Sequence, residues 1–193
     1  MSSPIPSETL TERLALRRPA PGDAEAVFAV NSDPRVWTHF PSLRPTESAQ
    51  ITTMIERWSR SWEARGLGSW VVRLQETGEV IGNGGCTMIA SDPDVPSARL
   101  WNLGYRIAAD HHGRGYATEL SRAALHAAAQ VDPDVPVIAF LVEHNRASAA
   151  VAEKVGLRLV HRAPDPGNPD PAVMRLVYAD RALSPAQRET AMR

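Results

Sequence analysis

Hydrophobic positions in the first half of the chain follow first a strand-like and then a helical spacing. The run at 13–18, "RLALRR", alternates as a short strand does. Residues 19–33 and 45–66 carry apolar side chains at helical spacing, and Gly66 is a suitable end for the second helix. Two apolar runs within 69–89 flank a Glu-Thr-Gly turn, which predicts a hairpin.

The second half alternates between apolar strand patterns and short helical patterns. They predict a strand at 99–108, a helix at 115–131, a strand at 135–143, a helix at 146–156 and strands at 157–162 and 172–179. The whole order, β-α-α-β-β-β-α-β-α-β-β, predicts one mixed α/β or α+β domain and differs from the repeated βαβ units of a dinucleotide fold. We assign residues 11–180 to this domain, 1–10 to an N-terminal tail, and 181–193 to a C-terminal tail or a short docking helix.

The composition narrows the classes of partner and compartment. The 193 residues suit one domain, and the formal net charge of -1 gives no electrostatic reason to expect nucleic acid or a membrane surface as a partner. Cys86 is the only cysteine, so a disulfide within the chain and a Cys-rich zinc site are excluded. Neither a signal-peptide pattern nor an apolar run of membrane-spanning length occurs, so we predict a cytoplasmic protein.

The stretch "HGRGYATEL" at 112–120 places two glycines directly before a predicted helix. Glycine weakens a helix, so this placement indicates amides that approach a ligand closely, and a helix N-terminus with free amides suits a phosphate. A dinucleotide fingerprint would need a third glycine where Thr118 stands, and a nucleotide P-loop would need a Lys after Gly115. A tight strand-to-helix turn without a ligand is the structural alternative.

Residues 112–117 resemble the Q/R-x-x-G-x-G/A signature of the GNAT superfamily of N-acetyltransferases, with His112 in place of Gln or Arg. The segment "VEHNRASAAVAEKVGLRL" at 142–159 resembles the superfamily's N-x-x-S/A … E-K-x-G-F segment. Residues 11–36 and "ETGEVIGNGG" at 76–85 resemble the RimJ/RimL branch of ribosomal-protein N-terminal acetyltransferases. The resemblance therefore follows the chain in order over most of its length.

The resemblance implies a single domain whose mixed, mostly antiparallel sheet has helices on both faces. It also implies a splay between the superfamily's fourth and fifth strands, here 99–108 and 135–143. The implied activity is transfer of an acetyl group from acetyl-CoA, directly in a ternary complex, to a primary amine of a protein N-terminus or a small molecule. Acetyl-CoA is then a co-substrate, and no metal is expected, because the adjacent His111 and His112 lack an evident third ligand. The sequence leaves open whether the chain acts alone or as a homodimer.

The same resemblance assigns the contacts with acetyl-CoA. The glycine-loop amides would bind its pyrophosphate, and a main-chain N–H near 106–108 would bind the thioester carbonyl. The implied cofactor-binding residues are Ile107, Ala108, His112, Gly113, Arg114, Gly115, Tyr116, Ala117, Asn145 and Ser148.

The candidate catalytic residues depart from the usual pattern. Many members carry a Tyr seven residues after the Asn of the second segment, but Ala152 stands there. Ser148 becomes the candidate proton donor to the leaving thiolate, although a hydroxyl there can equally cap a helix. Glu143 is the candidate base, with His144 and Glu119 as alternatives. The missing Tyr also keeps open a second function, a non-catalytic acetyl-CoA-binding sensor or interaction module.

The loop at 33–43, "DPRVWTHFPSL", carries bulky residues between two predicted helices. By resemblance this loop borders the amine acceptor. Trp37, His39 and Phe40 are therefore candidate substrate-binding residues, with core packing as the alternative for each.

Overall fold

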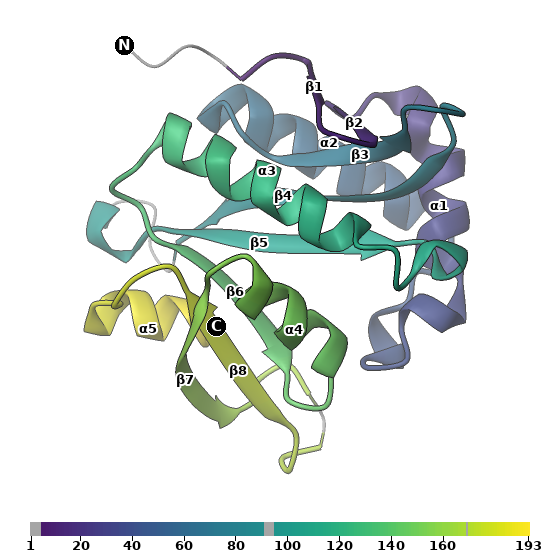
Figure 1. The fold of residues 1–193 in the computed structure, drawn as a ribbon. Helices are drawn as coiled ribbons and strands as arrows, with labels where there is room; N and C mark the ends of the chain where they lie inside the picture. Colours follow the sequence, from purple (N-terminus) through teal and green to yellow (C-terminus); the bar gives the residue numbers. More distant parts are fainter. Residues whose placement is uncertain (1–4, 91–94, 169) are drawn as a thin grey trace.

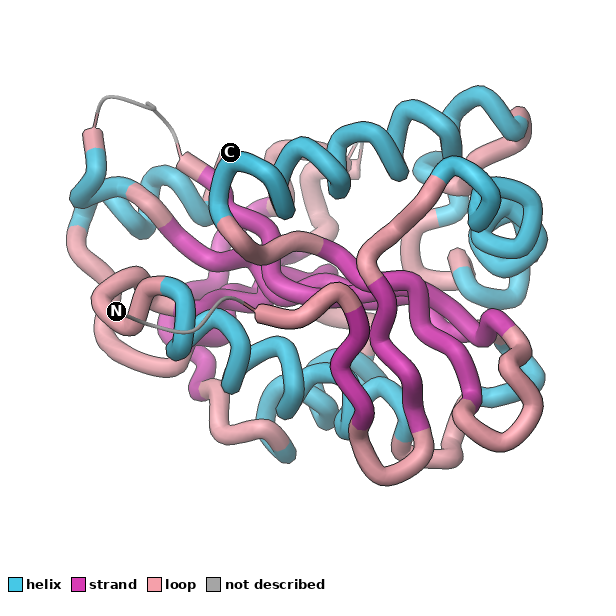
Figure 2. The backbone as a smooth tube through the Cα atoms, turned by 90° about the horizontal axis from the view of Figure 1, so that it is seen from above, coloured by secondary structure: helices cyan, strands magenta, loops and turns pink. Residues whose placement is uncertain are grey.

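A computed structural model describes residues 5–90, 95–168 and 170–193, so the first four residues of the expected N-terminal tail lie outside it. Its strands are β1 (Glu8–Leu10), β2 (Leu14–Arg17), β3 (Ser69–Leu74), β4 (Val80–Ile89), β5 (Leu100–Ile107), β6 (Val137–Val142), β7 (Arg158–Pro164) and β8 (Met174–Ala179). Its α-helices are α1 (Ala24–Ser32), α2 (Ser48–Arg65), α3 (Tyr116–Val131), α4 (Arg146–Lys154) and α5 (Pro185–Ala191). The strands form one sheet with helices on both sides (Figures 1 and 2).

The sheet order confirms the predicted fold. The strands follow the order β1-β2-β3-β4-β5-β6-β8-β7, and every neighbouring pair is antiparallel except β5 and β6. A parallel pair needs a long crossover, which α3 provides. β5 and β6 pair only through Trp101 with Val137 and Asn102 with Ile138. Beyond these residues the two strands separate, which is the splay expected between 99–108 and 135–143.

The two faces of the sheet are covered by different helices. Leu103 and Ile107 of β5 share a buried cluster with Leu120 of α3. Leu100 of the same strand belongs instead to a cluster that contains Ala191 of α5. Side chains alternate along a strand, so Leu103, Tyr105 and Ile107 face α3, whereas Asn102, Gly104 and Arg106 face the side of α5. On that second side α1 and α2 cover the other half of the sheet (Figure 1).

Both expected tails contain ordered elements. Within 1–10, β1 pairs with β2 in the register Thr9 to Leu16, so the sheet extends into the segment that we assigned to a tail. Within 181–193, α5 begins at a Ser184 cap and packs against β5, β6 and β8, so the docking-helix alternative describes this segment. Across the described residues, no helix combines the length and apolarity that a membrane span requires.

Candidate active site

The separation of β5 and β6 opens a cleft through the sheet. Two adjoining cavities of about 360 Å³ and about 460 Å³ occupy it, and both are bordered by Tyr105, Arg106, Asn145 and Ser148. The larger cavity also borders the glycine loop before α3 and residues of α4. The smaller one also borders the loop between α1 and α2 and the turn between β7 and β8. One cleft therefore joins the two faces of the sheet.

The main-chain N–H groups of β5 point alternately toward β4 and toward the side of β6, where the cleft lies. The Ala108 N–H donates to the Ile81 carbonyl at 2.8 Å, so it is used by the pairing with β4. Successive N–H groups of a strand point to opposite sides, which directs the Ile107 N–H toward the gap with β6. The Trp101 N–H, six residues before Ile107 and so on the same side of the strand, donates to the Pro136 carbonyl at 2.9 Å. The Ile107 N–H therefore lies on the side of the gap, whereas the Ala108 N–H, which we also expected there, is used within the sheet.

The glycine loop has a backbone that favours glycine at two positions. Gly113 and Gly115 adopt φ values of 75° and 84°, in the left-handed region that side chains disfavour. A Cβ on Gly113 would meet no atom within 4 Å, so the loop faces open space. His112, Gly113, Gly115, Tyr116 and Ala117 border the larger cavity, whereas the exposed Arg114 does not.

Arg13, which directly precedes β2, contacts this loop. Its Nη1 donates to the Arg114 carbonyl at 2.9 Å, and its guanidinium lies over the Tyr116 ring, 4.5 Å from the centroid. Its Nη2 lies 2.7 Å from the Glu119 carboxylate, which also accepts from Thr11. Burial raises the pKa of Glu119, but these hydrogen bonds lower it by more. Glu119 is therefore an anion that braces the loop and does not border the cleft.

The two adjacent histidines turn to different partners. His112 Nε2 lies 2.8 Å from the Ile107 carbonyl, which fixes the strand end beside the glycine loop. His111 Nε2 lies 3.2 Å from a Glu79 carboxylate oxygen. Among the described residues, no three His, Cys, Asp or Glu side chains gather where one metal ion could bind them.

Two hydroxyl groups meet at the centre of the cleft. Asn145 caps α4 by accepting from the Ser148 N–H at 3.2 Å, which places Ser148 on the cleft wall. Tyr105 Oη is buried and makes no well-formed hydrogen bond within the described residues. Burial raises the pKa of Tyr105, and the neighbouring Ser148 hydroxyl partly offsets this. Ala152 is buried in the same wall, and Tyr105 places a phenol in the same cavity.

Glu143 lies outside both cavities, contrary to its expected role as the base. Both of its carboxylate oxygens accept from Arg162 at 2.8 Å, and this ion pair lowers the pKa of the carboxyl. Arg162 belongs to β7, and β8 lies between β7 and β6, so the pair holds the carboxylate away from the gap with β5. His144 is exposed, and its Nε2 lies 3.0 Å from the His39 carbonyl.

The loop between α1 and α2 forms one wall of the smaller cavity. Trp37, His39 and Phe40 all border the smaller cavity. The Trp37 indole N–H donates to the Asn31 carbonyl at 2.6 Å, and its ring lies 3.7 Å from the Arg106 guanidinium carbon. Trp37 therefore supports Arg106 as well as the cavity wall.

His39 and Arg106 form a contact that sets the charge of each. Arg106 Nη1 lies 2.9 Å from the Val36 carbonyl, to which it donates, and 3.3 Å from His39 Nε2. Burial, and next the Arg106 charge, lower the pKa of His39 to about 4. Burial lowers the pKa of Arg106 to about 10. At neutral pH the pair therefore consists of a neutral imidazole and a guanidinium cation.

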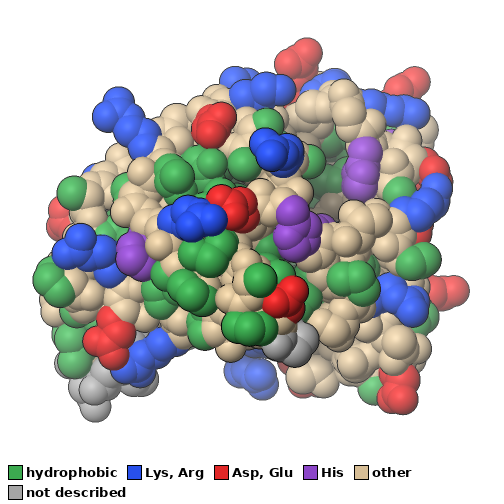
Figure 3. Space-filling view, turned by 90° about the horizontal axis from the view of Figure 1, so that it is seen from below, with side chains coloured by type: hydrophobic (Ala, Val, Ile, Leu, Met, Phe, Trp, Pro, Cys, Tyr) green, Lys and Arg blue, Asp and Glu red, His purple; other side chains and the backbone are tan. Residues whose placement is uncertain are grey.

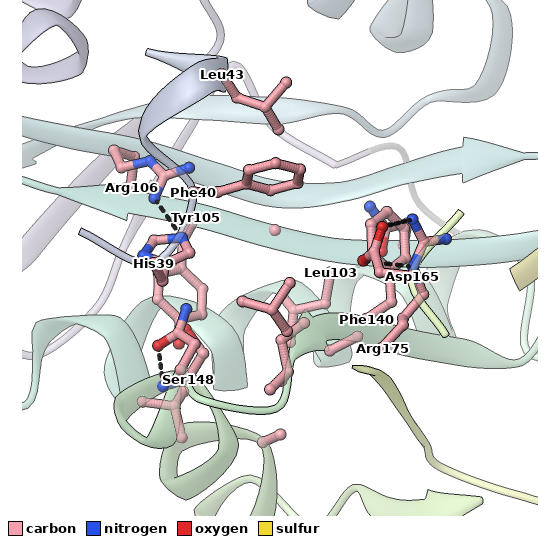
Figure 4. Close-up of a pocket in the computed structure, with 18 of the residues that line it drawn as sticks. His39, Phe40, Leu43, Leu103, Tyr105, Arg106, Phe140, Ser148, Asp165 and Arg175 are labelled. Carbon is pink, nitrogen blue, oxygen red and sulfur yellow. Dashed lines mark hydrogen bonds and ion pairs between the residues drawn. The ribbon is translucent and has the colours of Figure 1, made fainter. Parts of the chain in front are cut away.

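The far end of the smaller cavity holds a buried ion pair. Arg175 of β8 binds both oxygens of Asp165, with Nε at 3.1 Å and Nη2 at 3.3 Å. The two side chains are only 7% and 4% exposed, and the guanidinium also lies over the Phe140 ring. Figure 4 shows this pair at one end of the cavity and Arg106 with His39 at the other.

A family model described as the acetyltransferase (GNAT) domain matches residues 13–158. The chain belongs to the GNAT acetyltransferase family. An acetyltransferase structure from Agrobacterium tumefaciens is 30% identical, with 94% of this chain and 98% of that one covered and a TM-score of 0.70. The uncharacterized N-acetyltransferase YoaA of Bacillus subtilis is 34% identical over 57% of this chain and 59% of its own length. RimL, a ribosomal L7/L12 alpha-N-protein acetyltransferase in complex with coenzyme A, shares the fold, with 16% identity, coverage of 91% and 97%, and a TM-score of 0.72.

Two residues of this GNAT cleft were missed in the sequence, although a signal for them exists. Tyr105 and Arg106 are adjacent residues of the strand predicted at 99–108. They lie beyond Asn102, the last residue of this strand that pairs with β6, and so within the expected splay. Alternation alone places one on each face there. The Asp165–Arg175 pair has no comparable signal, because its partners come from a loop and a strand whose contact depends on the register of β7 and β8.

Proposed function

We propose that this enzyme transfers an acetyl group from acetyl-CoA to a primary α-amine, directly and in a ternary complex, as in the RimJ/RimL branch. The observation that carries the proposal is the single cleft, with an anion-binding loop on one face and a cavity of different chemistry on the other. The faces meet at Tyr105 and Ser148. Two substrates that enter from opposite faces would meet at these hydroxyls without a covalent enzyme intermediate.

Main-chain groups suit the cofactor. The amides at the start of α3 lack helical partners and are favoured sites for a pyrophosphate. The separated edges of β5 and β6 leave main-chain groups that can bind an extended amide-containing arm, as strand addition does. Bound there, acetyl-CoA supplies the reactive thioester. The Ile107 N–H then donates to the thioester carbonyl oxygen, where negative charge develops.

The hydroxyls of Tyr105 and Ser148 suit the departure of the thiolate. Tyr105 Oη has an unused donor, and its raised pKa keeps the proton on the phenol at neutral pH. Ser148 lies beside it on the helix cap. We assign the proton donor to Tyr105, with the Ser148 hydroxyl beside it, rather than to Ser148 alone.

The charges in the cleft favour an α-amine over a lysine side chain. Asp165 is the only carboxylate among the described residues that border the cavities, and Arg175 binds both of its oxygens. His39 is neutral, but its Nε2 faces Arg106. No strong base is therefore free, and water must accept the proton. An α-amine with a pKa near 8 loses its proton more readily than a lysine amine near 10.4. The name of RimL describes such an α-amine acceptor.

A cytoplasmic location accords with the free, buried Cys86.

The test combines cofactor binding with an acceptor panel. We expect acetyl-CoA to raise the melting temperature and NAD to leave it unchanged, because only a ligand of the folded state shifts the equilibrium. Thiol release is then followed with short peptides and small amines. Initial rates should give intersecting lines, as a ternary complex requires. Acetyl-CoA binding without transfer to any amine would instead support the sensor alternative, and acetylation of the enzyme itself would refute direct transfer.

A further inference from the structure

Arg106 brings a positive charge into the cleft that no carboxylate of the described residues neutralises. Its guanidinium contacts the Val36 carbonyl, His39 Nε2 and the Trp37 ring, and all three are uncharged. Burial lowers its pKa to about 10, which still leaves it a cation at neutral pH. The cleft therefore holds a partly desolvated cation, which is costly unless an anion joins it.

The other two arginines that border the cavities differ from Arg106 in this respect. Arg35 binds Asp33 and Asp110, and Arg175 binds Asp165. The structure thus supplies anions for the neighbouring arginines and leaves Arg106 without one. The difference is local, because the face in Figure 3 carries side chains of both charges with no extended area of one sign. The formal net charge of the chain is only -1.

Arg106 borders both cavities, but its side chain and the glycine loop lie on opposite faces of β5. Ile107, the next residue, packs against α3, whose N-terminus carries the glycine loop. Arg106 points to the opposite face of β5, where it contacts the loop between α1 and α2. In Figure 4 the guanidinium lies beside His39 and Phe40 at the wall of the acceptor cavity. Its charge is therefore directed at the acceptor.

The guanidinium also has donors to spare. Nη1 of Arg106 makes both polar contacts of the guanidinium, with the Val36 carbonyl and with His39. Nε and Nη2 have no hydrogen-bond partner among the described residues. Stacking on Trp37 fixes the plane of the fork. A fixed fork with two unused donors matches the two oxygens of a carboxylate or phosphate.

We propose that Arg106 selects acceptors whose amine is accompanied by an anionic group, a carboxylate or a phosphate. The inference rests on the proposed acetyl transfer to an amine, and it names the class of that amine. Free amino acids, peptides with an acidic residue near the N-terminus, and phosphorylated amines share this chemistry.

Acceptor pairs in which one member carries an additional anionic group test the proposal. The pairs are serine with serinamide, an Ala-Asp peptide amide with its Ala-Asn counterpart, and O-phosphoserinamide with serinamide. We expect kcat/KM in at least one pair to favour the anionic member about tenfold or more, because its anion fills the fork. The pair with the largest ratio identifies the source of the anion.

Three variants assign the preference to Arg106. Arg106→Gln should reduce the ratio to about one, and Arg106→Lys should keep part of it because the charge remains without the fork. Arg35→Gln should keep the full ratio, since Arg35 is already paired with Asp33 and Asp110. A wild-type ratio of one in every pair, or a full ratio in Arg106→Gln, would overturn the proposal.

Binding provides a readout that does not need turnover. The N-acetylated forms of these acids and amides are titrated into wild type and Arg106→Gln by calorimetry. In the same titrations the fluorescence emission of Trp37, which stacks on Arg106, is identified by comparison with Trp37→Phe. Tighter binding of the acids to wild type alone supports the proposal, and equal binding of acids and amides refutes it. Acetylation of amines without charge preference would refute the anion site but keep acetyl transfer. Failure to acetylate any amine would refute acetyl transfer, while the titration still decides the anion site.

Discussion

The two halves of the cleft are formed by different kinds of group, main-chain amides in one and side chains in the other. The half that we assign to the cofactor is formed by His112, Gly113 and residues 115–117 of one loop, and by main-chain amides at a strand end and a helix start. The half that we assign to the acceptor is formed by side chains from four separate segments, represented by Trp37, Arg106, Phe140 and Asp165. The first half needs only the correct backbone, whereas the second needs each side chain and its charge partner. Cofactor binding should therefore tolerate changes in side chains that alter the choice of acceptor.

The largest effect is expected at Tyr105, where the halves meet. Tyr105→Phe should lower kcat about a hundredfold, the scale of general acid catalysis, with little loss of stability because the removed hydroxyl has no well-formed hydrogen bond. Steady-state kinetics and thermal unfolding measure the two quantities. Tyr178→Phe is the matched control, since that phenol lies outside the cavities and contacts Glu153. Full turnover of Tyr105→Phe would leave the proton to Ser148 or water.

A glycine substitution should disable the cofactor half by itself. Gly113→Val should weaken acetyl-CoA binding by about tenfold or more, because a β-branched side chain disfavours positive φ and enters the space before the amides. Calorimetric titration with acetyl-CoA measures this. Gly78→Val carries similar backbone strain at φ 73° in a remote turn, so it should lose stability but keep the affinity. Equal affinity in both variants would reduce the glycine loop to a turn.

Substitution in the acceptor loop should have the complementary effect. Phe40 borders only the smaller of the two described cavities, so Phe40→Ala should raise the KM of the amine about fivefold and leave the KM of acetyl-CoA unchanged. Leu10→Ala removes an exposed apolar side chain far from the cleft and serves as the control. An unchanged amine KM would mean that the loop is only scaffold.

The contact between His39 and Arg106 predicts a dependence of stability on pH. Burial and the Arg106 charge lower the pKa of His39 from 6.5 to about 4. Between these values the unfolded chain binds more protons at this site, so stability is present above pH 6.5 and is lost as the pH falls toward 4. His39→Gln should show a shallower loss over this range in chemical unfolding experiments. Parallel curves for the two proteins would contradict the assigned environment of His39.

The smallest effect is expected where the sequence suggested a base. Glu143→Gln breaks an ion pair whose carboxylate side chain is 46% exposed and outside the cleft, so kcat should stay within about twofold and the acidic limb of the pH–rate profile should not move. Arg162→Gln breaks the same pair from the other side and should behave alike. A large loss in Glu143→Gln but not in Arg162→Gln would restore Glu143 as the base.

The sequence by itself determined the order of the elements and the glycine loop that we assign to the cofactor. Periodicity placed the strands and helices in order, and the two glycines before α3 indicated free amides, because backbone requirements leave marks in neighbouring residues. The capping role of Asn145 can also be inferred from sequence, because a helix cap depends only on neighbouring residues.

Only the tertiary structure decided the charges of the acceptor half. Glu143 follows a strand that borders the cleft, yet Arg162 from β7 removes its carboxylate from the site. Asp165 is neutralised by Arg175, whereas Arg106 has no such partner among the described residues. An ion pair depends on distances of a few ångströms between residues far apart in the chain, and local pattern does not contain those distances. The sequence therefore located the glycine loop and the separation of the two strands, and the packing of the sheet determined which charged groups line the cleft.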